Sequence, residues 1–116
     1  MPRCIHLHAF QHARATIRLV AQATAGTRAD GDLVSQLRRA AISVAANLAE
    51  GASRTPRDFL RFLRIADGSN EEVQALVLIA QDAGAFPADT STRILDQAAE
   101  TGRLIGGLIR RHAGGG

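Results

Sequence analysis

The chain has 116 residues, a formal net charge of +3, and 46% hydrophobic against 22% charged residues. This length suits one domain and is too short for two, and the balance excludes an intrinsically disordered chain. All fourteen strongly basic residues are Arg, and both Trp and Tyr are absent. Because Ala and Leu supply much of the apolar content, the composition favours helices over strands.

Cysteine usage and the N-terminal stretch bear on the cellular compartment. Cys4 is the single cysteine, so no disulfide can form within the chain, which fits a reducing compartment. The stretch from Ile5 to His8 is interrupted by His and is not typical of a secretory signal. No apolar run approaches the roughly 20 residues that span a membrane. We therefore expect a cytoplasmic protein without membrane contact.

Four segments carry apolar residues at steps of three and four, which predicts helices over about residues 6–24, 31–52, 56–83 and 89–112. Short connections rich in Gly, Pro and Asp separate them, so consecutive helices must pack as antiparallel neighbours. The predicted fold is all-α, an antiparallel up-and-down four-helix bundle in which residues 1–116 form one domain. A flexible tail is expected from Gly114 to Gly116.

The start of the third helix carries the clearest boundary signal. Thr55 suits the N-cap, Pro56 the first helical position, and Asp58 follows the cap by three residues as in a capping box. Asp30 is expected to cap the second helix in the same way. Gly68, in the middle of the third helix, costs about 1 kcal/mol relative to Ala, so we expect a close helix contact there.

The last part of the third helix, from Leu76 to Ala80, is apolar on every side of the helix. A helical segment of this kind is normally covered on every side, which four helices alone do not easily achieve. We expect a second subunit to cover it, with loops and the N-terminus as the alternative cover. The predicted contact of a homo-oligomer consists of Leu76, Leu78 and Ile79.

The N-terminal segment places Cys4, His8 and His12 at intervals of four, so that one helix face could present all three as metal ligands. Spacing is the only support, and a solvated polar face is the preferred interpretation. A di-metal centre in the bundle core needs Glu-x-x-His pairs, and no Glu of the chain has a His three residues later. We expect neither a metal nor another cofactor.

A polar row borders the apolar stripe of the second helix and contains Gln36, Arg39, Ser43, Asn47 and Glu50. A hydrogen-bonded network that links Arg39, Asn47 and Glu50 would fix helix register or join subunits. An active site is the alternative, but Ser43 has no His within helical reach to activate it. We expect a structural network and no enzymatic activity.

Asn70, on the core-facing side of the third helix, is expected to make a polar core contact of the same kind.

A basic track at the start of the third helix contains Arg54, Arg57, Arg61 and Arg64, spaced by three and four. Such a track can bind phosphates, whereas a solvated or subunit-contact face is the alternative. A genome rich in G and C is the simpler explanation for the exclusive use of Arg. Without Trp or Tyr for stacking, any nucleic-acid binding should be to the backbone and should weaken steeply with salt.

Two stretches of these helices resemble the bacterial four-helix bundle proteins linked to 23S ribosomal RNA intervening sequences. The first runs from Gln36 to Gly51 and the second from Phe59 to Ser69, with Glu71 and Glu72 just after it. The resemblance implies a four-helix bundle that assembles as a homopentamer. A related accessory protein of diversity-generating retroelements is similar in fold, is basic, and binds nucleic acid and its reverse transcriptase.

The resemblance transfers residues but no active site, because that family has no agreed one. This chain departs from the pattern at Ala45, where many relatives have Pro, and in its lack of Lys. The positions that match are Arg38, Arg39, Asn47, Glu50, Arg61 and Arg64, and the polar network is expected to include Arg38 together with Ser43.

These observations together predict a non-enzymatic, oligomeric scaffold that binds RNA, DNA or a nucleic-acid-processing protein through an Arg-rich surface. The alternative is a purely structural protein–protein interaction module without affinity for nucleic acid.

Overall fold

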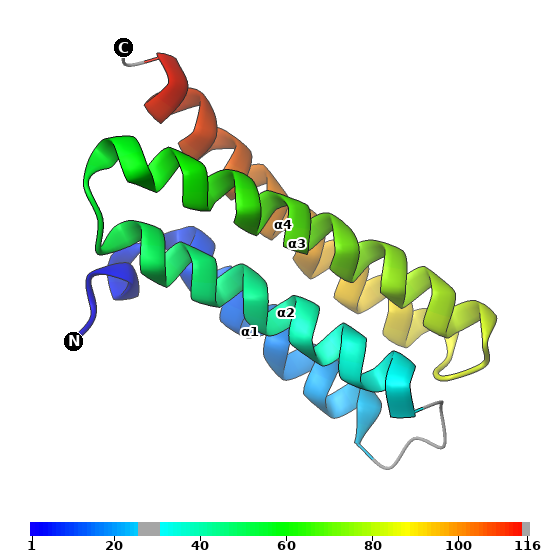
Figure 1. Ribbon diagram of the computed structural model, residues 1–116. Coiled ribbons are helices and arrows are strands. Elements are labelled where there is room, and N and C mark those ends of the chain that lie inside the picture. Colours follow the sequence, from blue (N-terminus) through cyan, green and yellow to red (C-terminus); the bar gives the residue numbers. More distant parts are fainter. Residues whose placement is uncertain (26–30, 115–116) are drawn as a thin grey trace.

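The computed structural model describes residues 1–25 and 31–114 and consists of helices in that part of the chain (Figure 1). A short 3₁₀ helix, η1 (Arg3–His6), precedes α1 (His8–Thr24), α2 (Gly31–Ala52), α3 (Pro56–Asp82) and α4 (Ala88–Gly114). The four α-helices lie side by side and run alternately up and down in a molecule of 47 × 26 × 20 Å. The predicted antiparallel four-helix bundle is confirmed.

The helices form a closed ring in which each packs on its two neighbours, with the most extensive contact between α2 and α3. Large apolar side chains fill the centre, among them Leu37, Leu48, Leu63, Ile94 and Ile105, each at most 1% exposed. Alanines on all four helices are buried beside them and let the helix backbones approach closely. Burial of this apolar surface is the main force that stabilises the bundle.

Both ends of α3 are capped by local interactions. At the N-terminus the Asp58 amide donates to the Thr55 hydroxyl at 3.3 Å, with Pro56 in the first turn, as predicted. At the C-terminus Gly84 has a φ of +76°, a left-handed conformation that favours glycine. The Ala85 amide then donates to the Ala80 carbonyl at 2.9 Å, which ends the helix. Asp30, the predicted cap of α2, lies outside the described residues.

Two glycines allow close approach of helices, and neither is Gly68. A Cβ at Gly51 would lie 2.7 Å from Phe59 Cδ1 and 2.9 Å from Phe62 Cβ, too close for any side chain. A Cβ at Gly102 would lie 3.0 Å from Asn70 Nδ2. A Cβ at Gly68 would meet nothing within 4 Å, because this residue lies on the exposed side of α3. The predicted close contact at Gly68 is therefore wrong within the chain.

Both ends of the chain differ slightly from the prediction. The first helix begins at His8 rather than near residue 6, because Leu7 is extended and separates η1 from α1. The last helix continues through Gly114, which was predicted as tail, while residues 115–116 lie outside the described part. Within the described residues, no helix combines the length and apolar character needed to cross a membrane.

Candidate nucleic-acid interface

The four predicted Arg residues are all exposed and lie at the α2–α3 turn and along the first turns of α3. The guanidinium groups of Arg61 and Arg54 lie over the Phe62 ring, 4.4 and 5.6 Å from its centroid. These cation–π contacts hold both side chains against the helix surface. The structure therefore brings two of the four predicted Arg residues, Arg54 and Arg61, together around the Phe62 ring.

Arg54 differs from the other three because it pairs with Glu50, and its Nε donates to Glu50 Oε1 at 2.9 Å. The hydrogen bond and the negative charge of Glu50 raise the pKa of Arg54. Arg57, Arg61 and Arg64 form no ion pair within the described residues, so their charge is not neutralised locally. These three are the better candidates for phosphate contacts.

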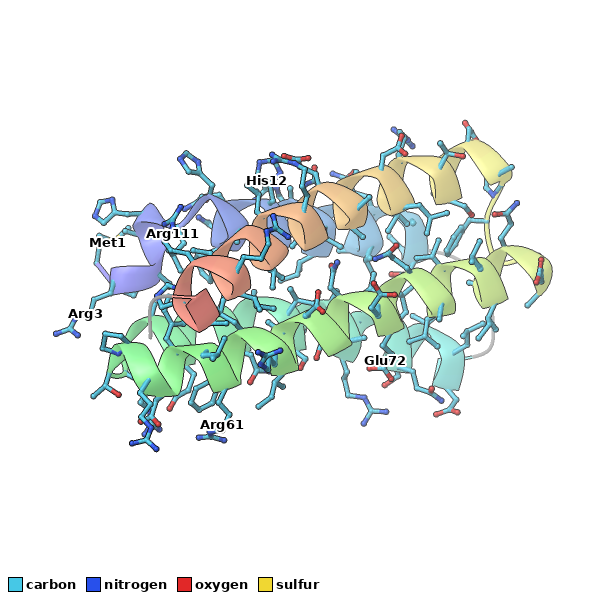
Figure 2. The ribbon with its side chains drawn as sticks, turned by 90° about the horizontal axis from the view of Figure 1, so that it is seen from above. Met1, Arg3, His12, Arg61, Glu72 and Arg111 are labelled. Carbon is cyan, nitrogen blue, oxygen red and sulfur yellow. The ribbon has the colours of Figure 1, made fainter. Side chains whose placement is uncertain are left out.

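The topology adds basic residues from distant parts of the sequence to the same end of the bundle. The His112 ring packs edge-on against Phe59 with centroids 4.8 Å apart, which places the end of α4 beside the start of α3. The N-terminus lies at this end too, and Figure 2 shows Arg3, Arg61 and Arg111 in the same half of the molecule.

We call this region, formed by residues 1–8, 50–64 and 100–114, the basic end. It holds eight of the fourteen Arg and only three of the eleven acidic residues of the chain. The sequence pattern of α3 alone missed Arg3, Arg110 and Arg111. An up-and-down bundle of four helices necessarily places both termini beside the second turn, so the predicted topology contained the signal that finds them.

The polar row of α2 forms a smaller network than predicted. Asn47 Nδ2 donates to the Ser43 carbonyl at 2.8 Å and to its hydroxyl at 3.1 Å, and the hydroxyls of Ser43 and Ser69 lie 2.8 Å apart. This network links α2 to α3. Glu50 pairs with Arg54 and does not join the network of Ser43, Asn47 and Ser69.

The two remaining Arg residues of the motif also lie outside this network. Arg38 Nε donates to the Thr24 hydroxyl at 2.9 Å and so connects α2 to the end of α1. Arg39 borders a shallow groove of about 260 Å³ together with Ser43 and Glu72. The predicted link from Arg39 to Asn47 and Glu50 is therefore absent from the described contacts.

Asn70 makes the predicted polar core contact. It is 1% exposed, and its Nδ2 donates to the Ala98 carbonyl of α4 at 2.8 Å. Gly102 leaves room for this amide, since a Cβ there would lie 3.0 Å from it. The contact fixes the register of α3 against α4.

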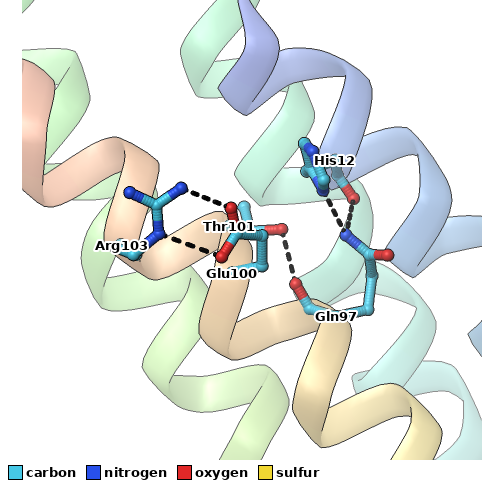
Figure 3. Close-up of polar contacts among 5 residues, drawn as sticks. All are labelled: His12, Gln97, Glu100, Thr101 and Arg103. Carbon is cyan, nitrogen blue, oxygen red and sulfur yellow. Dashed lines mark hydrogen bonds and ion pairs between the residues drawn. The ribbon is translucent and has the colours of Figure 1, made fainter.

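The spacing of Cys4, His8 and His12 does not produce a shared helix face. Cys4 is buried in η1, and the extended Leu7 interrupts the helical repeat before His8. His12 Nδ1 lies 2.7 Å from Gln97 Nε2, a contact between α1 and α4 (Figure 3). The described residues contain no group of three His, Cys, Asp or Glu side chains placed to hold a metal.

An ion pair on α4 lies close to this contact, as Figure 3 shows. Arg103 Nε donates to Glu100 Oε2 at 3.0 Å. The hydrogen bond from Arg103 lowers the pKa of Glu100, and Glu100 in turn raises the pKa of Arg103. Both side chains are substantially exposed, so the pair contributes little to stability.

Most of the chain matches one known protein family. The sequence model of the 23S rRNA-intervening sequence protein family matches residues 6–107, from before α1 well into α4. The chain belongs to this family. A search of curated proteins finds no match. The family match includes Arg54, Arg57, Arg61 and Arg64 but stops before Arg110 and Arg111, which therefore lie outside the matched region.

Of the three residues predicted to form the oligomer contact, one lies in the core and two lie on the surface. Leu76 is 7% exposed and packs in the core of its own chain, so it is not available to a partner. Leu78 and Ile79 are each 51% exposed, and Ile65, closer to the start of α3, is 42% exposed. Leu78 and Ile79 thus remain half-exposed in the described chain. We call Leu78 and Ile79 the apolar face of α3.

Proposed function

We propose that this protein is a non-enzymatic, homo-oligomeric scaffold that binds nucleic acid through its basic end. The observation that carries the proposal is the grouping of Arg residues from α3, α4 and the N-terminus at one end of the bundle. The family description refers to 23S rRNA, which agrees with an RNA-related role. A nucleic-acid-processing protein is the alternative ligand of the same surface.

The chemistry of the surface favours contacts to the phosphate backbone. Arg guanidinium groups bind phosphate oxygens in a bidentate manner, and each contact releases counterions, so affinity falls as salt rises. The chain has no Trp or Tyr, and Phe62 is buried beneath Arg61 and Arg54, which leaves little surface for base stacking. We expect binding with little base specificity.

Assembly is the second part of the proposal. The half-exposed Leu78 and Ile79 lie near the far end of α3 from the basic end, so a subunit contact there leaves the Arg residues accessible. The resemblance stated above implies five subunits. We propose a cytoplasmic homopentamer, consistent with the single Cys.

A purely structural interaction module is the competing function. The pairing of Arg54 with Glu50 and the presence of Asp58 beside Arg57 favour it, because both weaken the positive field. Non-enzymatic function is supported by Ser43, whose hydroxyl contacts Ser69 and Asn47 rather than a general base.

Fluorescence anisotropy of labelled duplex RNA, duplex DNA and single strands, from low to physiological salt, tests the proposal. Replacing Arg61→Glu and Arg64→Glu together should weaken binding by at least tenfold, because two phosphate contacts become repulsive. The control is Arg14→Glu with Arg18→Glu on α1, which makes the same charge change outside the basic end, at a spacing of four residues instead of three.

The control variant should retain most of the affinity, and both variants should keep the wild-type oligomer mass. Equal losses in the two variants would show a general charge effect rather than an interface. Absence of binding at low salt would leave the structural module as the function.

A further inference from the structure

A pocket of about 390 Å³ opens at the basic end, between the N-terminal segment and the last turns of α4. Its lining includes Arg103, Arg110 and Arg111 from α4 and also His6 and His8 from the segment that enters α1. No acidic residue lines it, although Arg103 is paired with Glu100 on the same helix. Arg and His side chains from two separate parts of the chain therefore line one half-open pocket.

The start of α1 adds to the positive field of this pocket. Leu7 occupies the N-cap position and supplies no side-chain acceptor, and the first turn of α1 has no acidic residue. The first amides of a helix lack partners within the helix and carry a partial positive charge. Because Leu7, His8 and Ala9 all line the pocket, this helix end faces the same volume as the Arg side chains.

Two consecutive glycines of α4 keep the wall of the pocket open. Gly in a helix interior costs about 1 kcal/mol relative to Ala, so a pair of them is unfavourable for the helix itself. A Cβ at Gly106 or Gly107 would lie 3.4 or 3.8 Å from the guanidinium nitrogens of Arg110. The Arg110 side chain thus folds back over this bare stretch of helix, and Gly107 itself lines the pocket.

The rest of the lining is apolar and comes chiefly from Leu7, Leu104 and Leu108. A phosphate alone would leave most of the volume empty, and a duplex backbone is too wide to enter it. Arg110 and Arg111 form no ion pair within the described residues, and two guanidinium groups suit the terminal phosphate of a monoester, with close to two negative charges, better than a singly charged diester. The apolar wall suits the less polar body attached to that phosphate.

We propose that this pocket binds a phosphate monoester of nucleotide size, with the phosphate held by Arg110 and Arg111, while Arg103 lines the pocket and stays paired with Glu100. Two sources share this chemistry, a free nucleoside monophosphate and the 5′-phosphorylated end of a nucleic-acid strand. The proposal goes beyond backbone binding by α3 and does not depend on it, since Arg61 and Arg64 do not line the pocket.

Isothermal titration calorimetry with AMP, adenosine and inorganic phosphate tests the first source. Anisotropy competition between a short strand with a 5′-phosphate and the same strand with a 5′-hydroxyl tests the second. We expect AMP, the 5′-phosphorylated strand or both to bind at least tenfold more tightly than the unphosphorylated counterpart. Tighter binding of AMP than of adenosine would identify a free nucleoside monophosphate as the ligand. Tighter binding of the 5′-phosphorylated strand than of the 5′-hydroxyl strand would identify the end of a nucleic acid.

Three variants separate pocket binding from general attraction of anions. Arg110→Gln with Arg111→Gln removes two cations, and Gly107→Leu fills the pocket without changing the charge. Each should abolish at least nine-tenths of the phosphate-dependent advantage. Gly68→Leu, the same change on the exposed side of α3 outside the pocket, is the matched control and should retain it.

The variant of Arg61 and Arg64 should keep the phosphate-dependent advantage even where it loses backbone binding, so the two proposals fail separately. Equal binding of phosphorylated and unphosphorylated probes would overturn the pocket proposal. So would a Gly107→Leu protein, folded by circular dichroism, that binds like wild type.

Discussion

Gly51 shows at the residue scale how a single missing side chain sets the packing of two helices. Replacing Gly51→Ala would place a Cβ within 3 Å of Phe59 and Phe62. The gain in helix propensity of about 1 kcal/mol is smaller than the cost of forcing this contact apart. We expect a net loss of about 1–3 kcal/mol in the free energy of unfolding, measured by urea denaturation.

Gly68→Ala is the matched control, because its Cβ meets nothing within 4 Å in the chain. This variant should gain up to about 1 kcal/mol from helix propensity. Similar stability changes in both proteins would contradict the steric explanation for Gly51.

The Glu100–Arg103 pair gives a second prediction at this scale, for the pH dependence of stability. Arg103 lowers the pKa of Glu100, so the folded state holds the charged carboxylate more tightly than the unfolded chain does. This small stabilisation is present above the ordinary pKa of Glu and is lost as the pH falls through the lowered value. Thermal denaturation of Glu100→Gln and wild type should therefore differ slightly at neutral pH and converge in acid.

At the scale of the element, α3 joins two surfaces of opposite character. Its first turns present Arg57, Arg61 and Arg64, and its last turns present Leu78 and Ile79. The sequence predicted its start correctly because Thr55 and Pro56 are local signals. It did not separate Leu76 from Leu78, because an all-apolar segment has no polar face. Extending the buried series through Val73, Val77 and Ala80 places Leu76 inside.

The apolar face of α3 leads to a prediction about assembly. Leu78→Glu with Ile79→Glu should convert the oligomer to monomers, because two charges would have to be buried without partners in the subunit contact. Native mass spectrometry measures this directly. Ala99→Glu on the exposed side of α4 is the control and should leave the mass unchanged. An unchanged mass in the double variant would place the subunit contact elsewhere.

At the scale of the whole molecule, periodicity and short connections were sufficient to predict the order and direction of the helices. The partners of individual polar groups were not predictable, because they depend on side-chain rotamers and on the register between helices. Glu50 is the clearest case, since both Asn47 and Arg54 lie within helical reach and only the structure shows that it bonds to Arg54. The pocket at the basic end required the three-dimensional path of both termini.

The concentration of Arg residues at one end of the bundle has a consequence for the proposed homo-oligomer. Cyclic symmetry about one axis turns each subunit without inverting it, so all basic ends would lie at the same height along the axis of the proposed ring. Several weak phosphate sites then act on one strand at a high effective concentration. We therefore expect the proposed oligomer to bind long nucleic acids more tightly than short ones of the same composition, because avidity rather than base contacts would select its ligand.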